Sequence, residues 1–351
     1  MSRKVMSEVL KSRTLLYRSF GEPEKVLELA TVDVESEPKK GQVLVQWLAS
    51  PINPLDINSI QGVYVYRPTP PVIGGSEGVG RVVKCSPGSA FSKGDHVTLF
   101  TMNTPFWTEY GIVDEEDLLK IDNRISVPMA ATLMVNPPTA WVMLKDFIDL
   151  SPGDYIIQNS ANSGVGRSVI ELCKAFGYKS INIVRDRPAI ESLKTELWKL
   201  GADHIFTEEE FAKEGRKFVK TLSSPPKLAM NGVGGRSSLG IAAVLEKGGT
   251  SVTYGGMSKK PHEFSTSALV FNDVRVRGVA VGMWMRQPEN EEKLELCLRE
   301  IQELAVAGKL TATPMDHVPL ERFQEALRKS MESRQKKQLL IISAQTSPSK
   351  L

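Results

Sequence analysis

The stretch from Tyr155 to Gly166 reads YIIQNSANSGVG, and an apolar helical pattern follows it. Its first four residues have the composition of a short buried strand, and small residues then lead into the helix. A phosphate-bearing ligand needs such a turn, because backbone N–H groups at a helix N-terminus must come close to the phosphate. A glycine turn also serves simply to reverse the chain, so the motif depends on its setting.

The setting is a regular alternation of short apolar stretches with amphipathic helical ones from about Pro152 onwards. The expected strands are Tyr155–Gln158, Ile181–Val184, His204–Phe206, Leu228–Met230, Ser251–Tyr254 and Val276–Val281. Two of the helices between them are expected to end at Gly177 and Gly201, where glycine adopts the left-handed cap conformation. This alternation predicts parallel βαβ units, and hence an α/β fold with a doubly wound parallel sheet.

The N-terminal part of the chain has a different residue pattern, typical of β-strands. Residues from about 14 to 135 contain strand-like runs such as Val43–Leu48 and Gly80–Val83, separated by proline and glycine turns. A chain of 351 residues is also long for one core, since domains usually have about 100 to 200 residues. We therefore predict a β-rich domain from residues 1–139 and 284–351, and a nucleotide-binding domain from residues 140–283.

Composition excludes several classes of protein. No stretch approaches the roughly 18 to 20 apolar residues of a membrane-spanning helix, so integral membrane association is not expected. Lys and Arg number 44 against 41 Asp and Glu, without a long basic run, and nucleic acid is therefore not an expected partner. The three cysteines form no Cys-x-x-Cys pair, which favours a reducing compartment over a disulfide scaffold.

The first 13 residues have two readings. Arg3, Lys4, Lys11 and Arg13 are opposed only by Glu8, and apolar residues between them share one helical face. That composition is typical of a mitochondrial presequence, although a short one. The other reading is a basic tail before the first strand, which would leave a cytoplasmic location open.

The end of the second expected strand distinguishes between dinucleotides. An NAD site usually has an acidic residue about 20 residues after the glycine turn, whereas this strand ends in Val184-Arg185-Asp186-Arg187. Arginine donates in a planar fork to phosphate oxygens, so Arg185 and Arg187 favour the 2′-phosphate of NADPH. Asp186 would suit a 2′-hydroxyl instead, and a solvated charged turn is the alternative to both.

Two more small-residue turns follow expected strands at the same edge of the sheet. They are Asn231-Gly232-Val233-Gly234-Gly235 and Tyr254-Gly255-Gly256-Met257. Ligands of open α/β sheets bind outside the carboxyl ends of the strands, so both turns are candidates for enclosing the cofactor. Either is also compatible with an ordinary loop.

A β-rich lobe, a nucleotide-binding fold and a return segment together resemble the medium-chain dehydrogenase/reductase superfamily, with a GroES-like catalytic domain and a Rossmann domain. Within it the chain resembles the mitochondrial trans-2-enoyl-CoA reductases, or 2-enoyl thioester reductases, from about residue 14 to 342. The matching segments are Ile52–Asn58, Ile60–Tyr64, Val135–Pro137, Asn162–Gly166, Asn182–Pro188 and Val252–Met257. The Val-Arg-Asp-Arg-Pro and Gln-Gly-x-Tyr elements separate this zinc-independent family from ordinary quinone reductases.

The resemblance implies NADPH-dependent reduction of trans-2-enoyl thioesters, carried on CoA or acyl carrier protein, in mitochondrial fatty-acid synthesis. It also implies a homodimer in the mitochondrial matrix. In the family the tyrosine of the Gln-Gly-x-Tyr element is the acid or stabilises charge, which corresponds to Tyr64. A phenol with an ordinary pKa of about 10 is neutral at working pH and can donate a proton. From the residues alone Tyr64 would be read as a packing residue, and Tyr66 is its local competitor.

The cofactor-binding residues that the resemblance implies lie in separate segments. They are Asn136, Asn162, Ser163, Gly164, Val165, Arg185, Asp186, Arg187, Tyr254, Gly255, Gly256, Met257, Val279, Ala280, Val281 and Lys337. Asn136 has a helix N-cap as its alternative role. Lys337 has Lys336 beside it, and lysines of this kind are mostly solvated.

The chain departs from the family pattern at two places. Val279-Ala280-Val281 stands where the family has an aromatic and bulky residues, and Tyr66-Arg67 replaces smaller apolar residues after the catalytic element. Both changes leave the acyl chain length open. They affect the reaction type less.

Zinc is not expected. The zinc-dependent branch of the superfamily uses Cys, His and acidic ligands, and its Gly-His-Glu element here reads Gly74-Gly75-Ser76-Glu77-Gly78. Two other functions stay open at this point. One is an NADPH:quinone reductase, which needs no positioned acid, and the other is a nucleotide-binding protein without turnover on the same fold.

Overall fold

The computed structural model describes residues 9–65, 67–100, 105–332 and 336–343, which form two compact units. Unit 1 contains the described residues up to Met134 together with those from Ala312 onwards, and unit 2 runs from Val135 to Thr311. The breaks after residues 134 and 311 differ from those expected after 139 and 283. Helix α11 (Glu291–Val306) belongs to unit 2 because it packs on helix α4 (Asn136–Lys145). Across this contact, Trp141 Nε1 donates to Glu300 Oε2 at 2.7 Å.

Unit 1 is built from two sheets in which the described strands pair antiparallel, apart from the last two strands, which pair parallel. In its described residues, β1 (Val9–Tyr17) pairs with β2 (Leu27–Glu35) and with β4 (Val72–Ile73). The larger sheet has the order β15 (Met315–Pro319), β16 (Lys337–Ile341), β3 (Gln42–Pro51), β5 (Val79–Cys85), β6 (His96–Leu99) and β8 (Leu118–Ile121), with β7 (Tyr110–Asp114) also on β3. The return segment thus supplies β15 and β16, and β16 lies antiparallel to β3 with Leu340 opposite Ser50.

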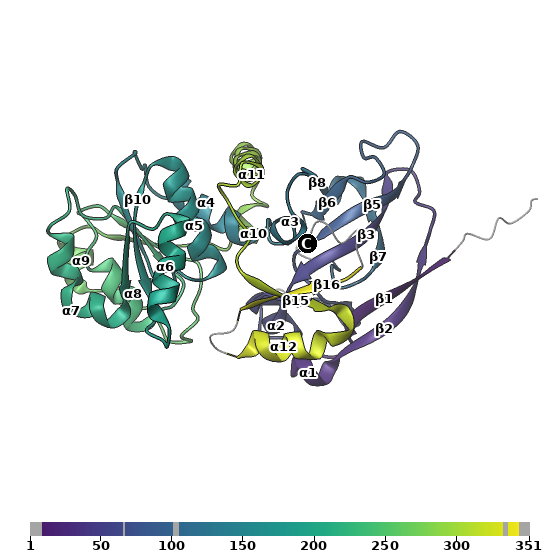
Figure 1. Cartoon of the computed structure of the whole chain (residues 1–351), viewed down its shortest axis with the longest axis horizontal. Helices are drawn as coiled ribbons and strands as arrows, with labels where there is room; N and C mark the ends of the chain where they lie inside the picture. The colour runs from purple at the N-terminus through teal and green to yellow at the C-terminus, as the bar shows by residue number, and fades with distance from the viewer. Residues whose placement is uncertain (1–8, 66, 101–104, 333–335, 344–351) are drawn as a thin grey trace, which may run out of the picture. The chain divides into compact units, whose positions relative to one another are not determined.

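Short helices pack against the sheets of unit 1, which enclose an aromatic core. They are α1 (Pro23–Val26), α2 (Pro54–Ile60), α3 (Val127–Ala130) and α12 (Phe323–Met331), with single 3₁₀ turns at Glu115–Asp117 and Leu320–Arg322. Figure 1 shows α12 beside β15 and β16 and close to α1 and α2. The expected inward face of α12, with Phe323, Ala326 and Leu327, is confirmed, and it packs on the core of Trp47 and Trp107.

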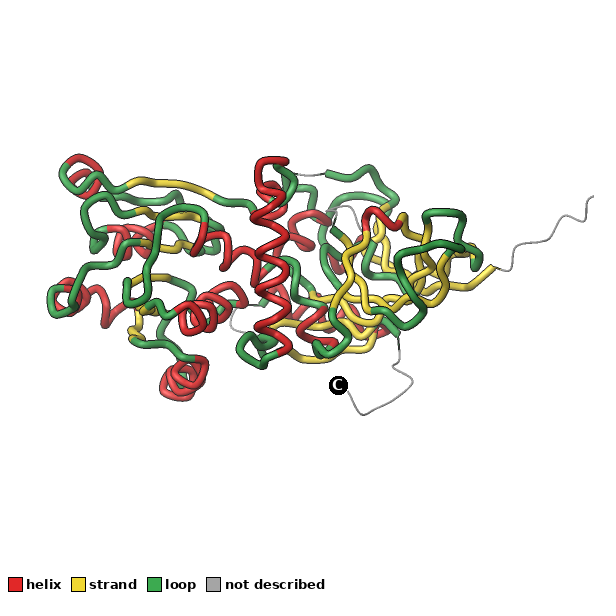
Figure 2. Tube along the Cα trace, turned by 90° about the horizontal axis from the view of Figure 1, so that it is seen from above, coloured by secondary structure: helices red, strands yellow, loops and turns green. Residues whose placement is uncertain are grey.

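Unit 2 is a parallel sheet with helices between its strands, as the sequence predicted. In the described residues the order is β11 (His204–Thr207), β10 (Lys179–Val184), β9 (Tyr155–Gln158), β12 (Leu228–Asn231), β13 (Thr250–Thr253) and β14 (Arg275–Gly278). The other helices are α5 (Gly164–Phe176), α6 (Ile190–Leu200), α7 (Glu208–Val219), α8 (Gly235–Ala242), α9 (Thr266–Val270) and α10 (Val281–Trp284), with a 3₁₀ turn at Pro288–Asn290. Figure 2 shows the contrast between this alternation and the strand-rich unit 1.

Local signals placed most boundaries in unit 2 correctly. Gly177 and Gly201 follow α5 and α6 with φ of 77° and 116°, the left-handed conformation expected of them. The strand expected to reach Val281 is the exception, because β14 ends at Gly278 and α10 begins at Val281. Gly278 pairs with Thr253, the last residue of β13, so the neighbouring strand offers no further ladder partner.

Among the described residues, none of the helices combines the length and the apolar character that crossing a bilayer requires.

Candidate active site

The glycine turn after β9 leaves room for nothing larger than hydrogen at two positions. A Cβ on Gly164 would stand 2.5 Å from Nδ2 of Asn136, and one on Gly166 would stand 2.6 Å from the backbone of Ala161. Ser163 is the N-cap of α5, and its hydroxyl accepts from the N–H of Gly166 at 3.1 Å. Because Gly164 and Gly166 carry no side chains, the backbone N–H groups at the N-terminus of α5 can be approached closely. This arrangement fits the pyrophosphate of a dinucleotide.

A buried glutamine beneath the turn holds it in place. Gln158, the last residue of β9, donates from Nε2 to the carbonyl of Gly166 at 2.9 Å and to Oδ1 of Asn182 at 2.7 Å. Asn182 in turn donates to the hydroxyl of Ser180 at 2.9 Å. These contacts tie the start of α5 to the centre of the sheet.

The charged segment after β10 offers cations in the place expected for a ribose contact. Arg185 and Asp186 are exposed and Arg187 is half-buried, directly after the last paired residue of the strand. Asp186 turns back on its own backbone, with Oδ1 accepting from the N–H of Arg187 at 2.8 Å. Guanidinium groups are suitable donors for a phosphate, so the expectation of a 2′-phosphate contact at Arg185 and Arg187 stays a prediction.

A network of neutral amides joins the ends of β9 and β12. Asn159 donates from Nδ2 to Oδ1 of Asn231 at 2.8 Å, and Oδ1 of Asn159 accepts from the N–H of Gly232 at 2.8 Å. Asn231 accepts from the N–H of Gly234 at 3.0 Å and donates to Nδ1 of His262 at 2.7 Å. We call Asn159, Asn231 and the backbone groups that they bind the amide network. It fixes the first of the two small-residue turns.

The second small-residue turn packs on the first. The ring of Tyr254 lies against Gly232, where a Cβ would come within 2.7 Å of the phenol carbon Cζ. The N–H of Met257 donates to the carbonyl of Gly232 at 3.1 Å, while Gly255 faces the same carbonyl. Burial raises the pKa of Tyr254 to about 12, with the side chain of Ser163 acting in the opposite direction. Tyr254 therefore lies near the N-cap of α5 and stays protonated at neutral pH.

The segment with Val279, Ala280 and Val281 leads from β14 into α10. The N–H of Val279 donates to the carbonyl of Thr253 at 2.9 Å, Ala280 is exposed, and Val281 is half-buried. Trp284 anchors the short helix by donating from Nε1 to Oδ2 of Asp146 at 2.7 Å. All of the cofactor residues expected in unit 2 thus follow the carboxyl ends of β9, β10, β13 and β14, apart from Asn136, which reaches Gly164 from α4.

Tyr64 lies in unit 1, just beyond the end of α2. Gly62 reverses the chain with a φ of 71°, and a Cβ there would stand 2.9 Å from Cγ of Phe20. The N–H of Tyr64 then donates to the carbonyl of Asn58 at 3.2 Å, and its side chain is half-buried. Burial raises the pKa of Tyr64, and the carboxyl group of Asp56 adds to that rise. The phenol is therefore a neutral donor at physiological pH. Tyr66 lies outside the described residues.

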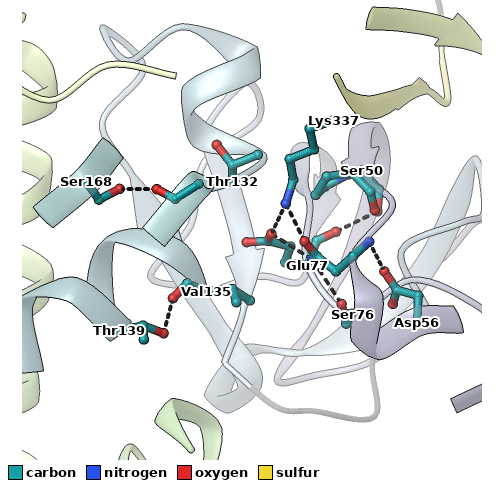
Figure 3. Close-up of polar contacts among 12 residues, drawn as sticks. Ser50, Asp56, Ser76, Glu77, Thr132, Val135, Thr139, Ser168 and Lys337 are labelled. Atoms are coloured by element: carbon teal, nitrogen blue, oxygen red, sulfur yellow. Dashed lines mark hydrogen bonds and ion pairs between the residues drawn. The ribbon is translucent and has the colours of Figure 1, made fainter. Parts of the chain in front are cut away.

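Lys337 also lies in unit 1, within a buried group of charges. Its ammonium donates to Oδ1 of Asn53 and stands 4.0 Å from Oε1 of Glu77. Asn53 donates from Nδ2 to Oε1 of Glu77 at 2.8 Å, and its backbone N–H donates to Oδ2 of Asp56 at 2.7 Å. Figure 3 shows Lys337 pointing toward Glu77, with Ser76 and Asp56 next to them. We call Asp56, Glu77, Lys337 and Asn53 the ionic cluster.

From the sequence, Lys337 was expected to bind the cofactor and Asn231 to begin a turn that encloses it, whereas Asn53, Asp56, Glu77 and Asn159 were given no role. Asn159 and Asn231 directly follow or end buried strands, and such polar residues at strand ends are a usable signal. The ionic cluster has no comparable signal, because Glu77 and Lys337 are far in the chain from the pair Asn53 and Asp56. In the described part of the chain, His, Cys, Asp and Glu side chains form no group of three that could hold a metal ion.

Comparison with known proteins identifies the lineage of both units. Residues 39–123 match the family model of the alcohol dehydrogenase GroES-like domain, and residues 164–299 match that described as zinc-binding dehydrogenase. The chain is 64 % identical over 344 residues to a mitochondrial enoyl-[acyl-carrier-protein] reductase of Caenorhabditis elegans, covering 98 % of this chain and 99 % of the relative.

Solved structures agree with that relationship. The Etr1p complex with NADP and crotonyl-CoA is 29 % identical to the chain, with a TM-score of 0.88, and covers 95 % of this chain and 100 % of the solved one. The mitochondrial 2-enoyl thioester reductase Etr1p/Etr2p heterodimer from Candida tropicalis is 30 % identical, with a TM-score of 0.87 and the same coverage.

Proposed function

The chain belongs to the mitochondrial enoyl-[acyl-carrier-protein] reductases, and we propose that it uses NADPH to reduce the α,β double bond of trans-2-enoyl thioesters. The observation that carries this function is its 64 % identity, over nearly its whole length, to a reductase of that name. The substrate is an enoyl-CoA or the corresponding enoyl acyl carrier protein. The product is the saturated acyl thioester.

Unit 2 supplies the cofactor site. The glycine turn at Asn162–Val165 fits the pyrophosphate, because Gly164 and Gly166 leave the helix N-terminus open. Arg185 and Arg187 are assigned to the 2′-phosphate, which explains a preference for NADPH. Asn136, Tyr254 to Met257 and Val279 to Val281 are assigned to the remainder of the dinucleotide, and Lys337 of unit 1 remains an expected cofactor contact. When bound, NADPH supplies a hydride for the β-carbon.

Unit 1 supplies the acid. As the β-carbon gains hydride, the electrons of the double bond move toward the thioester carbonyl, and the α-carbon must then take a proton. We assign this proton to the phenol of Tyr64, which burial keeps in its neutral form. The phenolate that remains recovers its proton from solvent. A quinone that accepts a hydride directly does not need such a positioned acid.

The location and assembly follow from the same family. The enzyme is mitochondrial, and we assign it to the matrix, where mitochondrial fatty-acid synthesis would use it. The proposed presequence covers residues 1–13. Residues 1–8 lie outside the described residues, and residues 9–13 begin the strand β1, so the helical face expected of them is absent there.

A homodimer is supported by the edge of the parallel sheet. In the described residues β14 is one of the two edge strands of the sheet, the other being β11, and the side chains of β14 are exposed. Val276 in this strand is 42 % exposed and Phe271 shortly before it is 75 % exposed, an unusual surface for large apolar side chains. A second copy pairing along β14 would cover them. Sedimentation analysis should then find a dimer that Val276→Asp dissociates, whereas a monomeric wild-type protein would exclude the proposal.

The function is tested by following NADPH oxidation at the nicotinamide absorbance. The substrate is a medium-chain trans-2-enoyl-CoA, with NADH and a quinone as comparators. We expect rapid turnover that is selective for NADPH, and a loss of about 100-fold or more in Tyr64→Phe, because general acid catalysis contributes about 10²–10⁴-fold. Tyr110→Phe, which changes a tyrosine elsewhere in unit 1, should retain activity.

Turnover of the quinone alone would reject the proposal in favour of a quinone reductase. NADPH binding without any turnover would favour a nucleotide-binding protein. Equal use of NADH would remove the assignment of Arg185 and Arg187.

A further inference from the structure

The helix α10 is a single turn, and its position depends on its last residue. It spans only Val281–Trp284, and helices shorter than about 12 residues are marginal without tertiary contacts. Ala280 and Met283 are exposed, so they add little packing. Trp284 is buried, with only 6 % of its surface exposed. The groups that Trp284 contacts therefore decide where α10 lies.

Trp284 is held at both of its polar ends by neighbouring helices. Its indole Nε1 donates to Oδ2 of Asp146, the C-cap of α4, at 2.7 Å. Its backbone carbonyl accepts at 2.9 Å from Nδ2 of the buried Asn290, the N-cap of α11. The side chain of Asp146 is only 17 % exposed, and its other oxygen pairs with the ammonium of Lys293. Figure 1 shows α10 beside α4 and α11, from which it takes its place.

The segment that leads into α10 is fixed at two points. At its start the N–H of Val279 donates to the carbonyl of Thr253 at 2.9 Å, which ties it to the end of β13. At its end the chain turns back on itself, with the N–H of Trp284 bonded to the carbonyl of Ala280 at 3.0 Å. Losing the anchor at Trp284 would therefore leave the segment Val279–Val281 fixed at its first residue only.

Helix α4 connects this anchor to the glycine turn. Asn136, its first residue, packs on Gly164, and Asp146 caps its end, about 15 Å further along the helix axis. The residues from Pro137 to Leu144 are all buried, so the helix is firmly packed between these two ends. One helix thus fixes both the turn assigned to the pyrophosphate and the segment assigned to the rest of the dinucleotide.

We propose that Asp146 is a positioning residue of the reaction, which acts through Trp284: it holds α10 on α4 and so places the segment Val279–Val281 beside the cofactor. This role rests on the proposed function only for the assignment of that segment to the dinucleotide. Without the hydrogen bond, the residues assigned to the pyrophosphate and the 2′-phosphate stay in place, because they lie on α5 and after β10. The nicotinamide would lose its orientation, to which hydride transfer is sensitive.

A second bond of the same kind on α4 provides a matched control. Trp141 Nε1 donates to Oε2 of Glu300 at 2.7 Å, and Trp141 is also buried. In both pairs a buried indole N–H meets a carboxylate, so loss of either acceptor leaves the same group unsatisfied. The pairs differ because Trp141 lies within α4, whereas Trp284 carries α10. A merely structural role for Asp146 therefore predicts equal effects when either acceptor is removed.

The first test measures kcat and the KM for NADPH with a saturating trans-2-enoyl-CoA. In Asp146→Ala kcat should fall about 10- to 100-fold and the KM for NADPH should change by less than about threefold, because a misplacement of about 1 Å mainly slows the chemical step. Glu300→Ala should keep a kcat close to that of the wild type. Asp146→Asn should recover most of the rate, since its amide oxygen still accepts from Trp284. Equal values of kcat in Asp146→Ala and Glu300→Ala would overturn the proposal, as would an Asp146→Asn variant as slow as Asp146→Ala.

The tryptophan variants decide the matter if a carboxylate variant does not fold. Trp284→Phe keeps a buried ring and removes the N–H donor, and Trp141→Phe is its control. We expect kcat to fall more in Trp284→Phe, and an equal or smaller fall than in Trp141→Phe contradicts the proposal. Lys293→Ala breaks only the exposed ion pair of Asp146 and should leave kcat unchanged. A loss in Lys293→Ala as large as that in Asp146→Ala would show that Asp146 does not act through Trp284.

A measurement without turnover separates this role from the proposed function. The nicotinamide fluorescence of NADPH bound to the intact protein should shift toward that of free NADPH in Asp146→Ala and match the wild type in Glu300→Ala. If the wild-type protein reduces no enoyl thioester, the proposed function fails, and this fluorescence still decides the role of Asp146. If the wild-type protein turns over normally and the two variants behave alike, only the positioning role fails.

Discussion

The two buried polar groups of this molecule perform comparable tasks with different chemistry. In unit 2 the amide network joins Asn159 and Asn231 and holds the turns that follow β9 and β12. In unit 1 the ionic cluster joins Asp56, Glu77 and Lys337 beside the helix that leads to Tyr64. Both position residues that we assign to the reaction.

This difference indicates which of the two buried groups makes the protein sensitive to pH. The amides are neutral, and their donors and acceptors are matched to one another and to the backbone, so they fix a shape at little electrostatic cost. The ionic cluster carries buried ionisable groups, and in such a place gain or loss of one proton changes the free energy considerably. We therefore expect the ionic cluster to make the stability of the protein depend on pH and the amide network not to do so.

The largest expected effect removes the cation of the ionic cluster. Lys337→Met leaves the carboxyl groups of Asp56 and Glu77 buried without it, and breaking such a group typically costs about 3–5 kcal/mol. Urea unfolding at pH 8 should show that loss of stability. The neighbouring exposed lysine provides the control, since Lys336→Met should change stability by less than about 0.5 kcal/mol. Equal losses in both variants would mean that burial of Lys337 is energetically unimportant.

A somewhat smaller effect is expected from the amide network. Asn231→Ala removes the acceptor for the N–H of Gly234 and the partner of Asn159, leaving buried polar groups unsatisfied at a cost of about 2–3 kcal/mol. Because no charge is involved, urea unfolding should give the same loss at pH 7 and pH 9. A loss that depends strongly on pH in this range would remove the proposed distinction between the two groups.

Measured per unit of pH, the smallest effect is the pH dependence of stability that Asp56 contributes. Its pKa is about 7 in the folded protein and about 4 when unfolded, so the folded state binds the extra proton between these values. The contribution is present below pH 4 and is lost as the pH rises to about 7, by at most about 1.4 kcal/mol per unit. Asp56→Asn should flatten the unfolding free energy over this window. A slope identical to that of the wild type would show that another group titrates there.

Much of the fold was predictable because its signals are local. The apolar stretch at Tyr155–Gln158, the glycines at 164 and 166 and the stops at Gly177 and Gly201 act within one or two turns of chain. The strand expected to end at Val281 was wrong by three residues, because its end depends on where the neighbouring β13 stops. The domain breaks differed for a similar reason, since α11 follows its packing on α4.

The sequence by itself determined the parallel sheet, the open glycine turn, the arginines that follow β10 and the tyrosine of the Gln-Gly-x-Tyr element. Periodicity, glycine conformation and strand ends depend on neighbouring residues, so they can be recognised from the sequence alone. Only the tertiary structure decided the surroundings of Lys337, whose ammonium meets Asn53 from 284 residues away. That contact exists because β16 pairs with β3 and because burial then makes each charge depend on its neighbours.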